Sequence, residues 1–185
     1  VTQSGETADT LEAMSEARAR GARTLSITNV EGSQADRTAD GSVLMHAGPE
    51  IGVASSKTFI NSMIAMQILA IRLGVTRGTL KGEAAMDLVH ALSRLPALLG
   101  QALELNERLR DNVAAKYARS RRFLFIGRGI LEPIAREGAM KLKEISYIHA
   151  EGMSAAEMKH GPIALVDAET PVVALAPLDD LYEKM

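Results

Sequence analysis

Short apolar runs that alternate with amphipathic helical segments constrain the fold of this chain more than any other feature. Runs typical of strands occupy Thr24 to Thr28, Ser42 to His46, Phe123 to Ile126 and Pro171 to Ala176. Helical periodicity covers Thr7 to Arg20, the residues after Val53, and Pro133 to Tyr147. Strands that alternate with helices form parallel sheets, so the pattern predicts an α/β protein.

The chain divides into two such units joined by a helical connector. We predict a first unit over residues 1–75, a connector over 76–120 and a second unit over 121–185. Pro96 interrupts the helical pattern of the connector, which predicts two helices there. The two units are alike in construction and not in residues, which suggests a duplicated α/β module.

The composition excludes several classes of function. The 185 residues are 46% hydrophobic and carry a formal net charge of -2, so nothing favours a nucleic-acid partner. The one basic cluster, Arg119, Arg121 and Arg122, is most simply a solvated helix end. The chain has no cysteine, which excludes a disulfide framework and a thiol nucleophile within it. The cytoplasm is the default location.

The most apolar segment runs from Phe59 to Leu73. It contains Asn61, Gln67 and Arg72 and is too short to cross a bilayer, so we expect a buried helix and no membrane partner. No basic and then apolar run opens the chain, so no signal peptide is predicted. Because Val1 is not preceded by Met and leads directly into a loop, we expect a piece of a longer protein.

The segment from Glu137 to Pro162 concentrates ionisable groups, with three Lys, four Glu and two His. Lys141 and Glu144 are three residues apart, so a helix would place them on one face as an acid/base pair. The alternative is the charged face of a surface helix, where such pairs are common. His160 precedes a Gly-Pro pair that should end the helix and leave its imidazole on a loop, whereas His149 is expected to pack or cap near the helix end.

The opening sequence T-Q-S-G-E-T places Thr2, Gln3, Ser4 and Thr7 where a loop enters a helix. Hydroxyl groups, an amide and free backbone N–H groups at a helix start are suited to binding a phosphate. An ordinary N-cap is the alternative, because Ser and Thr are favoured there without any ligand. The lysine of a Walker motif is absent.

The run from Gly48 to Lys57, G-P-E-I-G-V-A-S-S-K, combines a turn with small residues before a helix. Small residues allow a ligand to approach the backbone closely. A plain connection between a strand and a helix is equally compatible with this run.

Three segments in this order resemble the isomerase region of glucosamine-6-phosphate synthases, the isomerising glutamine-fructose-6-phosphate aminotransferases. They are T-Q-S-G-E-T-A-D-T-L, G-P-E-I-G-V-A-S-S-K, and K-L-K-E-I-S-Y-I-H-A-E with its later K-H-G-P. The resemblance covers nearly the whole chain. It implies two sugar isomerase (SIS) domains, each a doubly wound parallel sheet flanked by helices. The chain would hold the later part of the first domain and the early part of the second.

The resemblance also implies a substrate site. Thr2, Gln3, Ser4 and Thr7 match the phosphate-binding loop of the family, with Thr2 where Ser is usual, so a hydroxyl is kept. Val53 matches the residue whose backbone faces the sugar. The implied partner is therefore a phosphosugar.

The catalytic roles follow from the same resemblance. Glu144 matches the carboxylate that moves a proton between C1 and C2, and Lys141 matches the lysine beside it. His160 matches the residue that opens the sugar ring, which the neighbouring subunit contributes in the family, so a homodimer is implied. No cofactor and no metal are expected, and no metal-ligand spacing is present.

The function expected from this resemblance is conversion of fructose 6-phosphate and ammonia to glucosamine 6-phosphate. The glutaminase domain and the Schiff-base lysine of the family lie outside these residues, so the 185 residues alone are expected to be inactive. The alternatives are a glucosamine-6-phosphate deaminase of the sugar isomerase type, a non-catalytic phosphosugar sensor, and an oligomerisation piece without a ligand.

Overall fold

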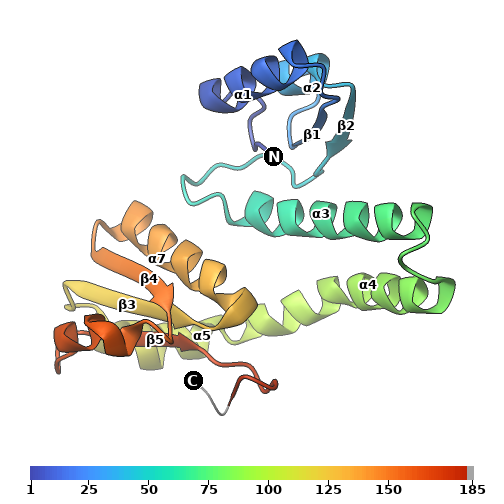
Figure 1. The fold of residues 1–185 in the computed structure, drawn as a ribbon. Helices are drawn as coiled ribbons and strands as arrows, with labels where there is room; N and C mark the ends of the chain where they lie inside the picture. The colour runs from blue at the N-terminus through green and yellow to red at the C-terminus, as the bar shows by residue number, and fades with distance from the viewer. Residues whose placement is uncertain (183–185) are drawn as a thin grey trace. The chain divides into compact units, whose positions relative to one another are not determined.

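The computed structural model describes residues 1–182. Contacts divide the chain into two compact units, Val1–Gly100 and Gln101–Met185, coloured blue to green and green to red in Figure 1. Both units contain parallel strands and helices, which confirms the α/β class. The boundaries at residues 75 and 120 stay predictions.

The sheet of the first unit is short and parallel. β1 (Leu25–Thr28) pairs with β2 (Gly41–Leu44), and Ile27 lies opposite Val43 in the register. A parallel bridge between Thr2 and Thr28 adds the start of the chain to the other side of β1. The opening loop therefore starts beside the carboxyl end of β1.

Helices lie on both faces of this sheet. Figure 1 shows α1 (Ala8–Ala19) and α2 (Gln34–Thr38) above the strands and α3 (Ser56–Thr76) below them. Ile27, Met45 and Ala65 form a buried apolar cluster, so α3 packs on the lower face of the sheet.

The expectation that the apolar segment from Phe59 to Leu73 is a short, buried helix is wrong on both counts. α3 has 21 residues, and only Thr58 and Ala65 are buried in it. By length and composition it is apolar enough to cross a membrane, and 11% of its most apolar window is buried. However, the Asn61 amide donates to the carbonyl of Met45 at 3.0 Å, so one side of α3 is fitted to the sheet edge.

The connector contains two helical segments, as predicted, but the break between them is not at Pro96. α4 (Gly82–Glu104) continues through Pro96, which does not divide it. The break comes at Leu105, after which the chain forms α5 (Asn106–Leu109). A π-helical turn, η1 (Arg110–Ala114), and α6 (Ala115–Tyr117) complete a second helical segment.

The second unit has a three-stranded parallel sheet with the order β4-β3-β5. Its strands are β3 (Arg122–Gly127), β4 (His149–Ser154) and β5 (Val172–Leu175). The chain moves from the central β3 to one side and then to the other, which is the start of a doubly wound arrangement. η2 (Gly129–Leu131) leads into α7 (Glu132–Ser146), which packs on β3 and β4 (Figure 1).

A strand stands where sequence patterns predicted none. β4 begins at His149, which is exposed and therefore does not pack in the core. Its side chain makes no hydrogen bond within residues 1–182, so it does not cap the preceding helix either. Gly152 explains how β4 fits beneath α7, because a Cβ on it would lie 2.3 Å from the Cα of Arg136. Two 3-10 turns, η3 (Met158–His160) and η4 (Pro162–Leu165), then lead towards β5.

Candidate functional site

The opening loop, Thr2 to Thr7, is fixed against the carboxyl end of β1. The backbone N–H of Thr2 donates to the carbonyl of Ile27 at 3.0 Å. The backbone N–H of Asn29 in turn donates to the carbonyl of Gln3 at 3.1 Å. Ligands of open α/β sheets bind at this edge, outside the carboxyl ends of the strands.

The hydroxyl groups of this loop lie close together. The Oγ1 atoms of Thr2 and Thr7 are 3.2 Å apart. The Gly5 N–H donates to Thr2 Oγ1 at 3.2 Å, and the Glu6 N–H donates to the Oγ of Ser4 at 3.1 Å. The loop thus gathers three hydroxyl groups around a sharp turn of the backbone.

Thr7 is the N-cap residue of α1, yet its side chain makes no capping hydrogen bond. The alternative interpretation of this threonine as an ordinary N-cap therefore lacks its defining contact. Within residues 1–182, no side chain caps the first-turn N–H groups of α1, which carry the positive end of the helix dipole. Such a helix start, combined with neighbouring hydroxyl groups, can accept an anion.

A second set of contacts, which sequence reasoning missed, holds the loop in place. The N–H of Ala35 donates to the carbonyl of Gly5 at 2.9 Å, and the N–H of Gln34 donates to Glu6 Oε1 at 2.8 Å. Gly5 has a φ of +72°, and a Cβ on it would lie 2.0 Å from the Oγ of Ser33. No local pattern signals these contacts, because Glu6 and Gln34 are 28 residues apart.

The loop after β2 lies at the same edge of the sheet. Asn29 connects the two loops, since its Oδ1 accepts the N–H of Ala47 at 2.9 Å and its Nδ2 donates to the carbonyl of Gly48 at 2.8 Å. Val53 follows on this second loop and is 81% exposed. The second loop therefore starts at the same edge of the sheet as the opening loop.

Glu50 folds the second loop onto the start of α3. Its Oε2 accepts the backbone N–H of Thr58 at 3.0 Å and the hydroxyl of the same residue at 3.1 Å. The Thr58 backbone N–H, helped by the hydroxyl, holds the pKa of Glu50 below its usual value of 4.5. Glu50 therefore serves as a side-chain cap for α3.

In the second unit, α7 carries a three-member charge cluster. Lys141 Nζ lies 3.2 Å from Glu144 Oε2 and 3.1 Å from Glu137 Oε1. Partial burial lowers the pKa of Lys141, but the hydrogen bonds to both carboxylates outweigh it and the pKa lies above its usual value. The predicted Lys141–Glu144 pair is present, and Glu137 is a third member that the prediction did not include.

His160 makes no hydrogen bond or ion pair with this charge cluster. It ends the turn η3, is exposed, and its backbone N–H donates to the carbonyl of Glu157 at 3.0 Å. Its imidazole makes no hydrogen bond or ion pair with the described part of the chain.

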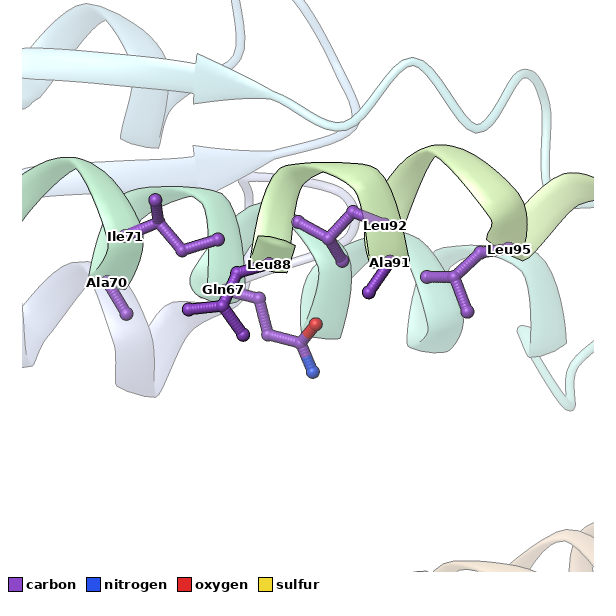
Figure 2. Close-up of a pocket in the computed structure, with 7 residues that line it drawn as sticks. All are labelled: Gln67, Ala70, Ile71, Leu88, Ala91, Leu92 and Leu95. Atoms are coloured by element: carbon purple, nitrogen blue, oxygen red, sulfur yellow. The ribbon is translucent and has the colours of Figure 1, made fainter. Parts of the chain in front are cut away.

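The hollow between α3 and α4 offers no comparable chemistry. It measures about 370 Å³, and Figure 2 shows aliphatic side chains around it, with Gln67 as the polar exception. Across residues 1–182, no group of three or more His, Cys, Asp or Glu side chains could hold a metal ion.

Comparison with known proteins identifies the family. The SIS domain family matches residues 1–72 and 116–184, which together make up most of the chain. The chain therefore belongs to the SIS domain family.

Two of the similar proteins are aminotransferases of one kind. The chain is 51% identical over 184 residues to the glutamine–fructose-6-phosphate aminotransferase (isomerizing) of Thermus thermophilus. It is 49% identical over 185 residues to the enzyme of the same name from Thermococcus kodakarensis. The whole chain is covered in both comparisons, but it spans only 30% and 31% of these relatives' lengths.

A solved structure shares the fold. The C-terminal domain of glucosamine-fructose-6-phosphate aminotransferase from Francisella tularensis superimposes with a TM-score of 0.95 at 40% sequence identity. The match covers 98% of this chain and 51% of that one. The predicted doubly wound sugar isomerase architecture is confirmed at the level of fold.

Proposed function

We propose that this chain is part of the isomerase module of a glutamine-dependent glucosamine-6-phosphate synthase. In this module, fructose 6-phosphate and ammonia are converted to glucosamine 6-phosphate. The observation that carries the proposal is the uncapped start of α1 beside the hydroxyl cluster of the opening loop. Similarity to aminotransferases along the whole chain supports the choice of substrate.

The phosphate of the substrate would lie at this helix start. Thr2, Ser4 and Thr7 would donate hydroxyl hydrogen bonds, and Gln3 would offer its amide. The free N–H groups of the first turn would add charge-assisted hydrogen bonds, which are stronger than neutral ones. The sugar would then extend along the sheet edge towards the backbone of Val53.

Proton transfer would fall to Glu144. After ammonia condenses at C2, the carboxylate takes a proton from C1 and returns a proton to C2, so a ketose imine becomes an aldose amine. A carboxylate suits this step because one group must act as base and then as acid. Lys141 holds the Glu144 side chain in position through the 3.2 Å ion pair.

Ring opening would use His160 from a second copy of the chain in a homodimer. The exposed imidazole without a partner in the described residues supports this role. The exposed apolar residues of α3 and α4 supply surface for such an assembly; they include Met66, Ile68, Leu73, Met86, Leu88 and Val89. A glutaminase domain of the complete protein would supply the ammonia in the cytoplasm.

The experiment uses the full-length protein. We expect glucosamine 6-phosphate to form from fructose 6-phosphate and glutamine, measured by chromatography of the amino sugar. Calorimetry should show binding of fructose 6-phosphate, and glucose should serve as the control without a phosphate. A protein that binds the phosphosugar but forms no product would support the sensor alternative instead.

A mixed dimer tests the shared site. Glu144→Gln and His160→Ala should each be nearly inactive as homodimers. A mixed dimer combines both lesions in one site and leaves the other site intact. Random reassembly makes about half of the dimers mixed, so about a quarter of the wild-type activity should return. No recovery, while wild type survives the same unfolding and reassembly, would contradict the shared site.

A further inference from the structure

A basic hollow lies at the amino edge of the three-stranded sheet, opposite the carboxyl ends of its strands. It measures about 870 Å³ and is bordered by the end of α6 and by the first residues of β3 and β4. The charged side chains of its lining are Lys116, Arg119, Arg121, Arg122 and Glu169, with His149 beside them. The arginine cluster is thus part of a concave surface and more than a solvated helix end.

Internal contacts fix one wall of this hollow. Arg122 forms an ion pair with Asp167, and its Nε donates to Thr170 Oγ1 at 2.6 Å. Asp167 Oδ1 accepts the same threonine hydroxyl at 2.7 Å and the backbone N–H of Glu169 at 3.0 Å. This wall is therefore ordered, and the charge of Arg122 is already balanced.

The other cations of the hollow lack a direct acidic partner among the described residues. Arg119 and Arg121 are exposed and form no ion pair with residues 1–182. The Nζ of Lys116 lies 5.0 Å from the centroid of the Tyr117 ring. Apart from Arg122, the lining therefore holds three cations and one carboxylate, that of Glu169, and the hollow keeps a surplus of positive charge.

We propose that this hollow is a second anion site, which binds a compact phosphorylated molecule with two or more negative charges. The planar guanidinium groups of Arg119 and Arg121 match the geometry of phosphate oxygens. The volume falls within the range of about 300–1,000 Å³ that small-molecule sites occupy. A nucleic acid would need an extended basic surface, which a chain of net charge -2 does not favour.

This second site is independent of the proposed function, because the opening loop and the α7 charge cluster contribute nothing to its lining. We would titrate the full-length protein with pyrophosphate by calorimetry, with fructose 6-phosphate at saturation to occupy the first site. The test variant is Arg119→Gln/Arg121→Gln. The control, Arg72→Gln/Arg94→Gln, removes the same charge from exposed positions on α3 and α4.

We expect wild type and control to bind pyrophosphate alike and the test variant to bind roughly tenfold more weakly or worse. Hydrogen exchange should show pyrophosphate protecting residues 116–122. If pyrophosphate does not bind to wild type, the proposed site is wrong. If the test and control variants lose the same affinity for pyrophosphate, net charge explains the binding, and the proposed site is equally wrong. Protection confined to residues 2–8 would place pyrophosphate in the opening loop and would equally overturn it.

Discussion

The opening loop and the loop after β3 both lead into a helix, but only the opening loop is suited to binding an anion. The opening loop carries three hydroxyl groups and enters α1 without a side-chain cap. The loop after β3 carries no hydroxyl group, and its two ends, Gly127 and Leu131, pack against each other, so we call it the closed loop. A Cβ on Gly127 would lie 2.2 Å from the carbonyl oxygen of Leu131, so the chain turns back tightly against the start of α7.

The helix starts differ as well. Pro133 stands in the first turn of α7 and has no N–H to offer a ligand. The N–H of Leu131 already donates to the carbonyl of Arg128 at 3.1 Å. A strand, a loop and a helix therefore do not make an anion site by themselves. Hydroxyl groups and unused N–H groups make the difference.

The functional groups of α7 lie at its other end. Lys141 and Glu144 occupy its last turns, at the opposite end from the closed loop after β3. Under the proposed function, the first unit holds the phosphate and the second unit moves the proton. Substitutions in the first unit should then affect binding of the phosphosugar, and substitutions in the second unit should affect the chemical step.

The largest effect is expected for Glu144→Gln in the full-length protein. The amide keeps the shape of the side chain but can no longer accept and return a proton, so kcat should fall about 10²- to 10⁴-fold. Fructose 6-phosphate should bind nearly as in wild type, as measured by calorimetry. Glu132→Gln, on the first turn of the same helix, is the control and should keep its activity. Equal losses of kcat in both variants would argue against a special role for Glu144.

Thr7→Val should produce the next largest effect, and it acts in the other unit. Valine removes the hydroxyl without changing the size of the side chain much. A hydrogen bond to a charged group contributes about 1.5–3 kcal/mol, so binding of fructose 6-phosphate should weaken about tenfold or more. Thr7→Ser keeps the hydroxyl and should bind close to wild type. If the valine variant binds as tightly as the serine variant, Thr7 has no role in binding the phosphate.

The sequence predicted the elements of regular pattern and missed those set by distant contacts. The strand at residues 24–28 and the helix at Pro133 to Tyr147 were found within a residue or two. β4 was missed because H-A-E-G-M-S has no β-branched residue, and its place depends on Gly152 passing beneath α7. Pro96 misled the prediction for α4, because tertiary and local context can carry a helix past a proline.

The candidate site shows the same limit. Lys141 and Glu144 are visible in the sequence because a helix brings residues three apart together. Glu6 and Asn29 are not visible, since their partners lie 28 and 18–19 residues away. Roles that depend on long-range backbone contacts need the fold to be known first.

Gly5→Ala tests whether the opening loop depends on α2. Alanine at Gly5 meets both a positive φ and the side chain of Ser33 at 2.0 Å. Gly32→Ala is a matched control, because its φ is +71° and nothing lies within 4 Å of the added Cβ. The free energy of unfolding of Gly5→Ala should fall about 1–3 kcal/mol below that of Gly32→Ala, as for overpacking. If urea titrations show the same loss of unfolding free energy for Gly5→Ala and Gly32→Ala, the opening loop can shift to accept the added methyl group without further loss of stability.

The smallest effect is a pH dependence in the loop that carries Val53. The Thr58 N–H lowers the pKa of Glu50 from its usual 4.5, so this cap stabilises the fold above that value. The stabilisation is lost as the pH falls through the lower pKa of the folded state. Glu50→Gln should therefore have a lower Tm than wild type at neutral pH, and the difference should vanish in acid.

Glu31→Gln provides the comparison for this last effect, because Glu31 is exposed and its side chain makes no hydrogen bond within residues 1–182. Its Tm should follow that of wild type across the same pH series. The closed loop after β3 has no such acidic cap, so the part of the acid sensitivity that depends on Glu50 should belong to the first unit. Hydrogen exchange at pH 7 and below 4.5 can locate it. A Glu50→Gln difference that persists unchanged in acid would show that packing, and not the charge of Glu50, holds the loop on α3.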